Sequence, residues 1–512
     1  MRSRITSDTA TADVETQSGT PTEGALHSGR LGVLGIVFFV VAAAAPLVGM
    51  TGGLPVAIVA GNGAAAPGSF VLVGITLLLF SVGYAAMSHR VTNAGAFYAY
   101  VGRGLGSVAG VGSAFVSLVA YFAIQLGIYG FFGATLALKM KSSTGLDLPW
   151  WLWAGAAWMV VLVLSCLSVD VGAKFLGVLM GCEIVALVVM SIAVLVKGGP
   201  SGIHVGDSFS LGKIFAGGLT GGAGIALAFA FASFIGFEAT AIYGEEAKDP
   251  KKTVPRATYV AVICITLLFA LSAFAVVTGL GSADAVAKTA KLSNGLVEPA
   301  SVVFGVADQY VGSWLGNVMG WLVLSSLFAG LLAFQNSSAR YLLALGRGGV
   351  LPRPLSTVNK AGAPAVASAT TSVIGIVVVA YFAISGKDPV STLFYWTTAL
   401  AVLAILLVEA LVCVAVISFF RREGGGNLWN ALIAPTLAFL GLAIGFYLLF
   451  SRFGLLAGTV RTGVDPTKQA WGFNTTGWVL TLTPWATLVI GLVVGISAKR
   501  NRDRAPLDSL MT

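Results

Sequence analysis

Long apolar stretches alternate with short polar segments along almost the whole chain. A helix needs about 20 apolar residues to cross the hydrocarbon core of a bilayer. Twelve stretches approach or exceed that length, at residues 31–60, 67–88, 106–138, 150–168, 172–196, 216–243, 257–280, 314–345, 364–384, 391–420, 428–451 and 474–498. The pattern predicts an all-α integral membrane protein with about 12 transmembrane helices.

Two of these spans contain an interruption. Residues 42–55 of the first span read AAAAPLVGMTGGLP, and residues 231–238 of the sixth read FASFIGFE. A broken membrane helix leaves backbone groups unpaired, which is tolerated only where they are buried in protein or line a cavity. Secondary transporters bind substrate at such breaks, and an offset of five spans reverses the direction of crossing, as in an inverted repeat. The alternative is that these glycines only allow close helix packing.

Composition narrows the class of protein. The chain has 512 residues, of which 57% are hydrophobic and 10% charged, which excludes an ordinary soluble domain. Four cysteines lie in apolar stretches without CxxC spacing, and there are three histidines, so a disulfide framework, a metal site or an enzyme with such ligands is not indicated. We find no GxxxxGK[ST] motif for ATP-driven transport.

The net charge of +9 comes from basic clusters at span ends, which topology explains without a nucleic-acid partner. If both termini are cytoplasmic, 20 of the 30 Lys and Arg residues lie inside. We therefore expect a multi-pass plasma-membrane protein with both termini in the cytoplasm. Residues 1–30 are polar and rich in Ser, Thr and Gly, which predicts a disordered cytoplasmic tail rather than a secretory signal. Residues 499–512 form a second expected cytoplasmic tail.

The two breaks suit a zwitterionic ligand. Half-helix N-termini present free N–H groups to a carboxylate, and unwound carbonyls accept from an ammonium group. The candidate substrate contacts are Gly49, Thr51, Gly52, Gly53, Ser233, Phe234, Ile235 and Gly236. The candidate cavity walls are Tyr121, Gln125, Phe328, Phe334, Tyr395 and Trp396, although aromatic residues in membrane helices more often pack or anchor at the interface.

Three carboxylates, Glu183, Glu238 and Glu409, lie inside apolar spans with no deep Lys or Arg to pair with them. Because an ionised carboxylate is costly there, the neutral acid is favoured. Glu183 and Glu238 are candidates for proton coupling; the alternative, favoured for Glu409, is a hydrogen-bonded acid that fixes helix packing. The adjacent hydroxyls of Ser325 and Ser326 are weak Na⁺ candidates, since Ser pairs more often bond the preceding helical turn. We expect H⁺ as coupling ion and no other cofactor.

Three segments carry a family resemblance. They are NAGAFYAYVGRGLG at residues 93–106, FIGFEATAIYGEEAKDPKKTVPRA at 234–257 and NSSARYLLALGRGGVLP at 336–352. In sequence and order they resemble the amino acid–polyamine–organocation permease family. The resemblance implies the LeuT fold, with a transport core at 31–420 made of inverted repeats at about 31–197 and 216–420. Spans at 428–498 follow this core.

The resemblance also implies a function, a secondary transporter of amino acids or related amines that works by alternating access. The sequence leaves open an exchanger, and a channel or non-transporting sensor on the same fold. Three positions depart from the family pattern. The family's GSG-like triplet is Gly49-Met50-Thr51-Gly52-Gly53 here, Gly348 replaces an acidic residue, and Glu183 occupies the position of a lysine found in some members.

Overall fold

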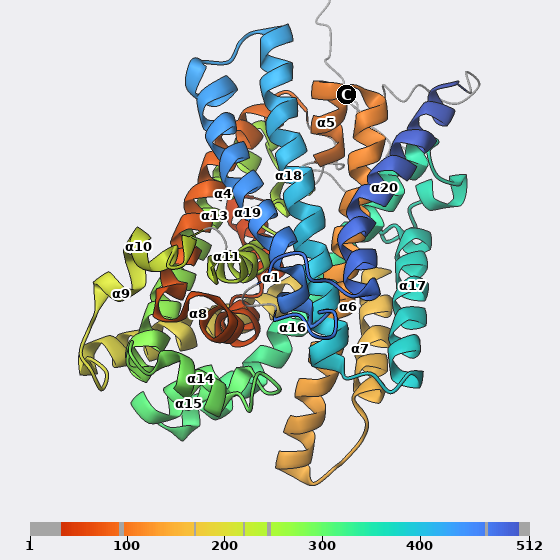
Figure 1. The fold of residues 1–512 in the computed structure, drawn as a ribbon. Coiled ribbons are helices and arrows are strands. Elements are labelled where there is room, and N and C mark those ends of the chain that lie inside the picture. Colours follow the sequence, from red (N-terminus) through yellow and green to blue (C-terminus); the bar gives the residue numbers. More distant parts are fainter. Residues whose placement is uncertain are drawn as a thin grey trace, which may run out of the picture.

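The computed structural model describes residues 32–91, 97–167, 170–218, 221–242, 247–465 and 469–500 (Figure 1). Within these ranges the chain is helical, with one isolated antiparallel bridge between Val460 and Phe473 and no β-strand. The expected tail at 1–30 and residues 501–512 of the expected C-terminal tail lie outside the described residues.

In the described ranges the long helices make twelve crossings. The first consists of α1 (Val33–Ala44), α2 (Pro46–Val48), a π-helical segment (Gly49–Gly53), α3 (Leu54–Val56) and a further π-helical segment (Ala57–Asn62). The next four are α4 (Ala66–Ser88), α6 (Ser107–Thr144), α7 (Trp150–Ser165) and α8 (Asp170–Lys197). The sixth is α11 (Ala223–Phe234) with α12 (Ala239–Ile242), and the last six are α13 (Pro250–Leu280), α16 (Ser313–Arg347), α17 (Ala365–Ile384), α18 (Tyr395–Glu423), α19 (Ala434–Ala457) and α20 (Thr475–Arg500).

Length supports this division. Nine stretches of the described chain are long and apolar enough to span a membrane, and the first of them covers 56 residues, Val33–Ser88. At about 1.5 Å per residue that stretch far exceeds a hydrocarbon core of about 30 Å. It turns back at Gly61, whose backbone is non-helical (φ −98°, ψ −126°), and therefore makes two crossings. The shorter apolar helices α7 and α11 contribute the remaining two, which confirms the predicted all-α membrane fold.

The outer surface of the bundle is apolar. Large hydrophobic side chains such as Val196 (81% exposed) and Ile384 (88% exposed) point outward, whereas Gln125, Gln335 and Glu238 are buried. A soluble protein would have the opposite arrangement, so this surface fits the hydrocarbon of a bilayer. Small residues let the helices approach: Gly491 of α20 lies against Gly112 of α6.

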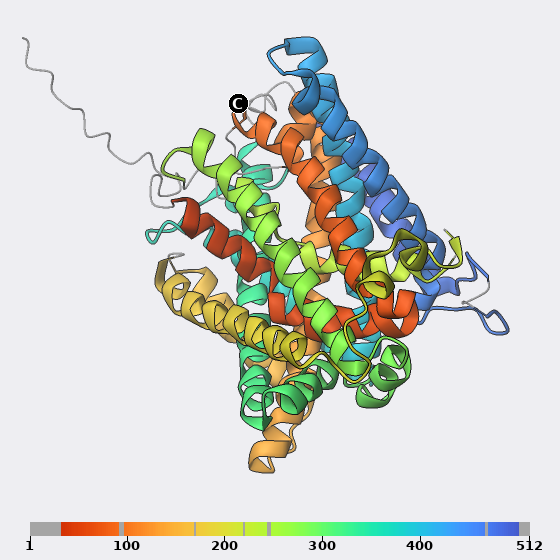
Figure 2. The same cartoon turned by 90° about the vertical axis from the view of Figure 1, so that its left-hand side faces the viewer.

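Helix packing repeats with an offset of five spans. Helix α6 packs on α18 as α16 packs on α8, and α13 packs on α8 as α4 packs on α18. Likewise α6 contacts α7 as α16 contacts α17. Each pair becomes its counterpart when both spans are shifted by five. This correspondence supports the proposed repeats at about 31–197 and 216–420, followed by the pair α19 and α20 (Figures 1 and 2).

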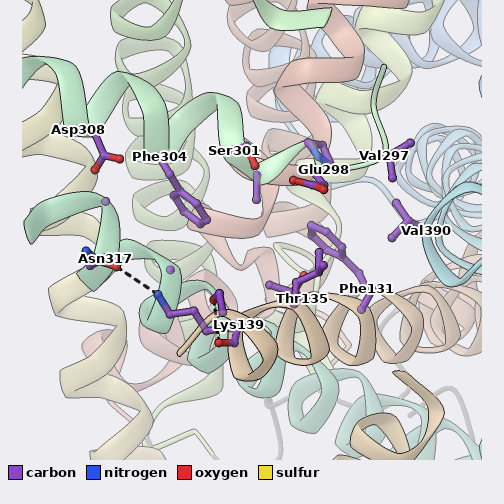
Figure 3. Close-up of a pocket in the computed structure, with 17 residues that line it drawn as sticks. Phe131, Thr135, Lys139, Val297, Glu298, Ser301, Phe304, Asp308, Asn317 and Val390 are labelled. Atoms are coloured by element: carbon purple, nitrogen blue, oxygen red, sulfur yellow. Dashed lines mark hydrogen bonds between the residues drawn. The ribbon is translucent and has the colours of Figure 1, made fainter. Parts of the chain in front are cut away.

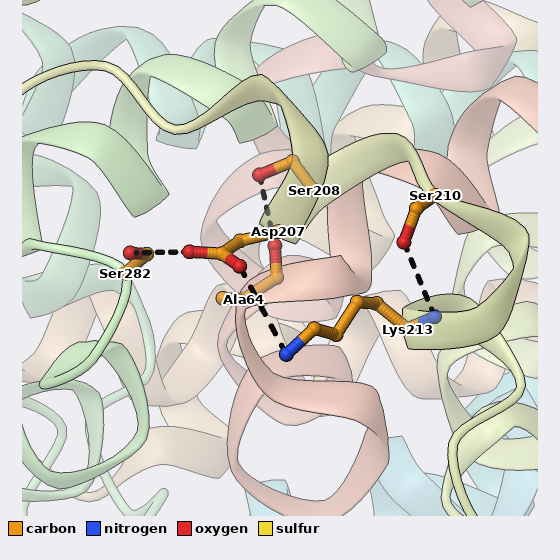
Figure 4. A network of polar contacts seen from close by, with 6 residues as sticks. All are labelled: Ala64, Asp207, Ser208, Ser210, Lys213 and Ser282. Carbon is orange, nitrogen blue, oxygen red and sulfur yellow. Dashed lines mark hydrogen bonds and ion pairs between the residues drawn. The ribbon is translucent and has the colours of Figure 1, made fainter.

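Short helices connect the crossings. They are α5 (Phe97–Leu105), α9 (Val205–Phe209), α10 (Leu211–Ile214), α14 (Ala285–Leu292) and α15 (Ala300–Tyr310). A polar network fixes α9 and α10 on the ends of neighbouring crossings (Figure 4). The Ser282 hydroxyl donates to the Asp207 carboxylate at 3.0 Å, and the Ser208 hydroxyl donates to the Ala64 carbonyl at 2.9 Å. The connection between the two proposed repeats is thus tied to both.

Candidate functional site: a cavity between two broken helices

The first crossing breaks at Ala45 and Pro46. Helix α1 ends at Ala44, Ala45 adopts a left-handed backbone (φ 44°, ψ 71°), and Pro46 starts the next helical segment. Proline disfavours the α conformation in the residue before it and has no N–H to continue the helix. The predicted glycine cluster lies just beyond the break, in the π-helical segment Gly49–Gly53. There the Thr51 hydroxyl donates to the Leu47 carbonyl at 2.7 Å, within its own helix.

The sixth crossing breaks at Ile235 and Gly236. Helix α11 ends at Phe234, Ile235 has an extended ψ of 129°, and Gly236 has φ +113°, a conformation that side chains disfavour. A Cβ atom at Gly236 would lie 2.6 Å from the Cβ of Ala43. Gly236 therefore lets the two broken helices touch at their breaks.

Glu238 caps the sixth-span break. One carboxyl oxygen accepts from the Gly236 amide at 2.8 Å, and the other accepts from the Tyr121 hydroxyl at 3.0 Å. The Glu238 carbonyl accepts from the Tyr84 hydroxyl at 2.7 Å, and the residue is fully buried. Tyrosines from the second and third crossings thus hold the break through one residue.

We expect Glu238→Ala to destabilise the protein by about 1–3 kcal/mol, the cost of leaving buried donors without a partner. The Gly236 amide and the Tyr121 hydroxyl would lose their acceptor. The thermal unfolding midpoint of purified protein should fall clearly for Glu238→Ala and much less for Glu238→Gln, which keeps one acceptor oxygen. Equal midpoints for wild type and Glu238→Ala would rule out this capping role.

A cavity of about 50 Å³ lies between the two breaks. It is lined by Ala43, Ala44, Ala45, Val48, Gly49, Gly53, Ile124, Ile128, Phe229, Ala232, Ser233, Ile235, Phe334, Phe394 and Thr398. None of these side chains is ionisable, and only Ser233 and Thr398 carry a hydroxyl. The volume suits about one or two water molecules, so binding an amino acid requires the surrounding helices or side chains to move.

The structure brings together half of the predicted substrate contacts. Gly49, Gly53, Ser233 and Ile235 line the cavity. Cβ atoms at Gly49 and Gly53 would each lie 3.1 Å from the Ser233 hydroxyl oxygen, so the first and sixth crossings meet closely here. Phe234 instead packs edge-on against Phe269, with ring centroids 5.4 Å apart.

Of the six predicted wall residues, Phe334 lines the cavity. Tyr121 binds Glu238, and the Gln125 side-chain amide donates to Gln335 Oε1 at 2.6 Å in a link between α6 and α16. The other three, Phe328, Tyr395 and Trp396, are not among the lining residues. The Tyr395 hydroxyl donates to the Leu296 carbonyl at 3.4 Å, and the Trp396 ring lies 4.9 Å from the Lys387 ammonium.

Sequence reasoning missed several lining residues. The Ala45–Pro46 dipeptide was a usable signal, because proline restricts the residue before it. Ile124 and Ile128 are one helical turn apart and so share a face of α6, but the sequence does not show which face meets the cavity. Thr398 of α18 and Phe394, the residue just before α18, show the same spacing.

Glu183 joins three crossings. It is buried on α8, and its carboxyl group lies 3.4 Å from the Ser325 hydroxyl of α16. That hydroxyl also donates to the Leu322 carbonyl of its own helix at 2.7 Å, the bond to the preceding turn that is usual for serine. The segment α2, just beyond the first-span break, packs on both α8 and α16. The second carboxyl oxygen of Glu183 and the neighbouring Ser326 hydroxyl are buried without a hydrogen-bond partner among the described residues. Two independent predictions, a coupling carboxylate and a hydroxyl pair, therefore converge at one place beside the break.

No basic side chain forms a salt bridge with Glu183 in the part of the chain that the structure describes. Glu409 is also buried, on α18. Arg422, near the end of the same helix, donates to the backbone carbonyls of Arg103 and Gly104. Among the described residues, the Ser325 hydroxyl is thus the one hydrogen-bond partner of the Glu183 carboxyl group.

Two facing broken helices around a buried cavity, in a bundle of twelve crossings, define a secondary-transporter architecture. Comparison with known sequences agrees with this class: the amino acid permease family matches residues 35–503. The chain belongs to the amino acid permease family. It is accordingly a membrane transporter rather than an enzyme, as the sequence indicated.

Individual relatives are distant. The branched-chain amino acid permease BcaP of Lactococcus lactis is 27% identical over 61% of this chain and 68% of its own length. The probable amino-acid permease meu22 of Schizosaccharomyces pombe is 24% identical over 69% of this chain and 60% of its own. A BcaP of Bacillus subtilis is 25% identical over 60% of this chain and 66% of its own. The matches to the latter two thus span less than two thirds of each relative.

Proposed function

We propose that this permease carries amino acids with apolar side chains across the plasma membrane by alternating access between the two broken helices. The observation that supports this substrate class most directly is the cavity lining, which has no ionisable side chain. A charged substrate side chain would be buried there without a partner, at high cost. Two relatives named as branched-chain amino acid permeases agree with an apolar substrate.

The main-chain groups at the breaks supply the polar recognition. The helical segment that begins at Pro46 presents amide groups and a positive dipole end to a substrate carboxylate. The carbonyl ends of α1 and α11 suit the substrate ammonium group. The apolar wall, including Ile124 and Phe334, then contacts the substrate side chain.

We expect leucine, isoleucine and valine to compete for labelled leucine uptake far better than lysine, arginine or aspartate. Uptake by cells or proteoliposomes carrying the permease measures this, with empty membranes as control. The free-energy difference should be at least about 2 kcal/mol, or roughly 30-fold in affinity, because an unpaired charge would enter an apolar site. Preference for lysine over leucine would contradict the proposed substrate class, and polyamines or related amines would become the next candidates.

The proposed coupling ion is H⁺, bound at Glu183. This carboxyl group contacts α16, and the segment α2 after the first-span break packs on both α8 and α16, so protonation of the carboxyl group can alter how α8, α16 and the first crossing pack. The Na⁺ alternative uses the hydroxyls of Ser325 and Ser326 at the same place. Amino acid exchange without net coupling, and a channel or sensor on this fold, remain the competing functions and are separated by the experiments below.

We also propose that both termini lie in the cytoplasm. Twelve alternating crossings place the start of α1 and the end of α20 on one face, which then holds most of the basic residues. In a variant without native cysteines, Thr6→Cys or Asp508→Cys should resist an impermeant thiol reagent in intact cells and react after permeabilisation. Free reaction in intact cells would invert the topology.

A further inference from the structure

A second pocket, of about 400 Å³, lies beside α15 (Figure 3), at the end of the bundle opposite the end of α20 (Figure 1). Its walls come from α6 on one side and from α15 and the beginning of α16 on the other. The volume falls within the range of about 300–1,000 Å³ that is usual for small-molecule sites. Unlike the cavity between the two breaks, called the central cavity below, this second pocket is lined by charged side chains; we call it the outer pocket.

Three ionisable side chains line the pocket: Lys139 of α6, Glu298 before α15, and Asp308 of α15. None of them forms a salt bridge within the described ranges. The Lys139 ammonium donates to Asn317 Oδ1 at 3.4 Å and lies 5.4 Å from the Trp321 ring centroid. A cation and two carboxylates therefore face one space without neutralising each other.

Helix α16 is shaped to receive two of these charges. A Cβ atom at Gly316 would collide with the Asp308 carboxylate, and one at Gly320 would lie 3.2 Å from the Lys139 ammonium. The two glycines are one helical turn apart, so a carboxylate and an ammonium lie over neighbouring turns of the same helix. An amino acid zwitterion is complementary to this pair: its carboxylate suits Lys139, and its ammonium suits Asp308 or Glu298.

One aromatic pair lies between this pocket and the central cavity. Phe131 lines the outer pocket, and Phe394 lines the central cavity. Their rings are stacked, with centroids 4.7 Å apart and planes at 24°. A Cβ at Gly52 of the first crossing would lie 3.2 Å from Phe131 and 3.3 Å from Phe394, so the glycine cluster packs directly on this pair.

We infer that the outer pocket is a second amino-acid-binding site, occupied before substrate passes the Phe131–Phe394 pair into the central cavity. Lys139 binds the substrate carboxylate, and Asp308 with Glu298 binds the ammonium group. The substrate class rests on the proposed function, but the site itself is defined by residues that do not line the central cavity. Phe304 and Phe131 offer an apolar surface to the substrate side chain.

The test measures protection of a pocket cysteine by L-leucine. Ser301→Cys, in the pocket wall, is placed in a protein without native cysteines that also carries Gly236→Leu to disable the central site. Leucine should slow labelling by an impermeant thiol reagent by the factor 1 + [leucine]/Kd, about tenfold when leucine is at about nine times Kd. Ser201→Cys, exposed on the same face but outside the pocket, should show no protection.

Lys139→Ala should raise the leucine concentration needed for protection by about tenfold or more, the effect of losing a charged hydrogen-bond partner. Lys141→Ala is the matched control, because Lys141 pairs with Asp147 at 2.8 Å and does not line the pocket. In this control, leucine should protect the pocket cysteine as well as it does without the Lys141 substitution. Protection that is absent in the Gly236→Leu background, or unchanged by Lys139→Ala, overturns the outer site. Leucine uptake is measured separately in the protein that keeps Gly236. Loss of that uptake would refute the proposed function, whereas loss of protection alone would refute the outer site.

Discussion

Gly236→Leu is expected to abolish binding of leucine at the central site while the protein still inserts into the membrane. A side chain at this position meets Ala43 at the contact between the two broken helices and must adopt φ +113°. Overpacking costs about 1–3 kcal/mol, and a strained backbone costs about 1–3 kcal/mol more. If the free variant relaxes away from this contact and only the substrate-bound arrangement needs it, affinity should fall by at least about 30-fold.

Two variants make this result specific. Gly155→Leu adds the same side chain to a membrane helix where a Cβ would meet nothing within 4 Å, so it should bind normally. Gly236→Ala adds only the Cβ and should give an intermediate loss. Size-exclusion chromatography of fluorescently tagged protein reports insertion and folding, and equilibrium binding of labelled leucine, measured at concentrations that detect the central site alone, reports affinity. Wild-type affinity in folded Gly236→Leu would mean that substrate binds elsewhere.

Glu183→Gln is expected to remove the pH dependence of net leucine uptake and to leave leucine exchange intact. Glutamine imitates the protonated acid, so the variant keeps the hydrogen-bonding shape of the neutral state but cannot release a proton. In wild type, an inward proton gradient should drive accumulation, and uptake should rise as the outside is acidified, because the carboxyl group must be protonated before it crosses. In Glu183→Gln, accumulation above equilibrium should be lost.

The matched control is Glu409→Gln, which changes another buried carboxylate, on α18. It should keep the wild-type pH profile. A wild-type profile in Glu183→Gln would exclude Glu183 as the proton carrier. Uptake that needs a Na⁺ gradient and ignores a proton gradient would point instead to Ser325 and Ser326, whose alanine variants should then lose Na⁺ dependence.

The sequence predicted the crossings well because hydrocarbon thickness and backbone hydrogen bonding act locally on each stretch. It also located the sixth-span break, because the backbone conformation there, φ +113° at Gly236, is one that only glycine adopts readily. The first-span break lies at Ala45 and Pro46, within the predicted interruption at residues 42–55, because the geometry of proline decides where the helix ends. Several glycines there serve close packing instead, as Gly52 does against Phe131 and Phe394.

The rest of the site depends on which side chains meet across long stretches of chain. Gln125 and Ile124 are neighbours in sequence, but one bonds Gln335 and the other lines the cavity. The rotation of α6 about its axis decides between them, and that rotation comes from packing against α16 and α18. The stacking of Phe131 on Phe394, like the convergence of Glu183 with Ser325, joins residues from different crossings and has no local signal.

Counterflow in proteoliposomes tests the central claim most directly, because it requires a binding site that alternates between the two sides of a membrane. Vesicles loaded with unlabelled leucine are diluted into a trace of labelled leucine, with Gly236→Leu vesicles as control. Alternating access predicts that labelled leucine transiently accumulates above its equilibrium level in wild-type vesicles only. Equilibration without an overshoot would indicate a channel, and no labelled leucine uptake would indicate a sensor or another substrate; either result would contradict leucine transport by alternating access.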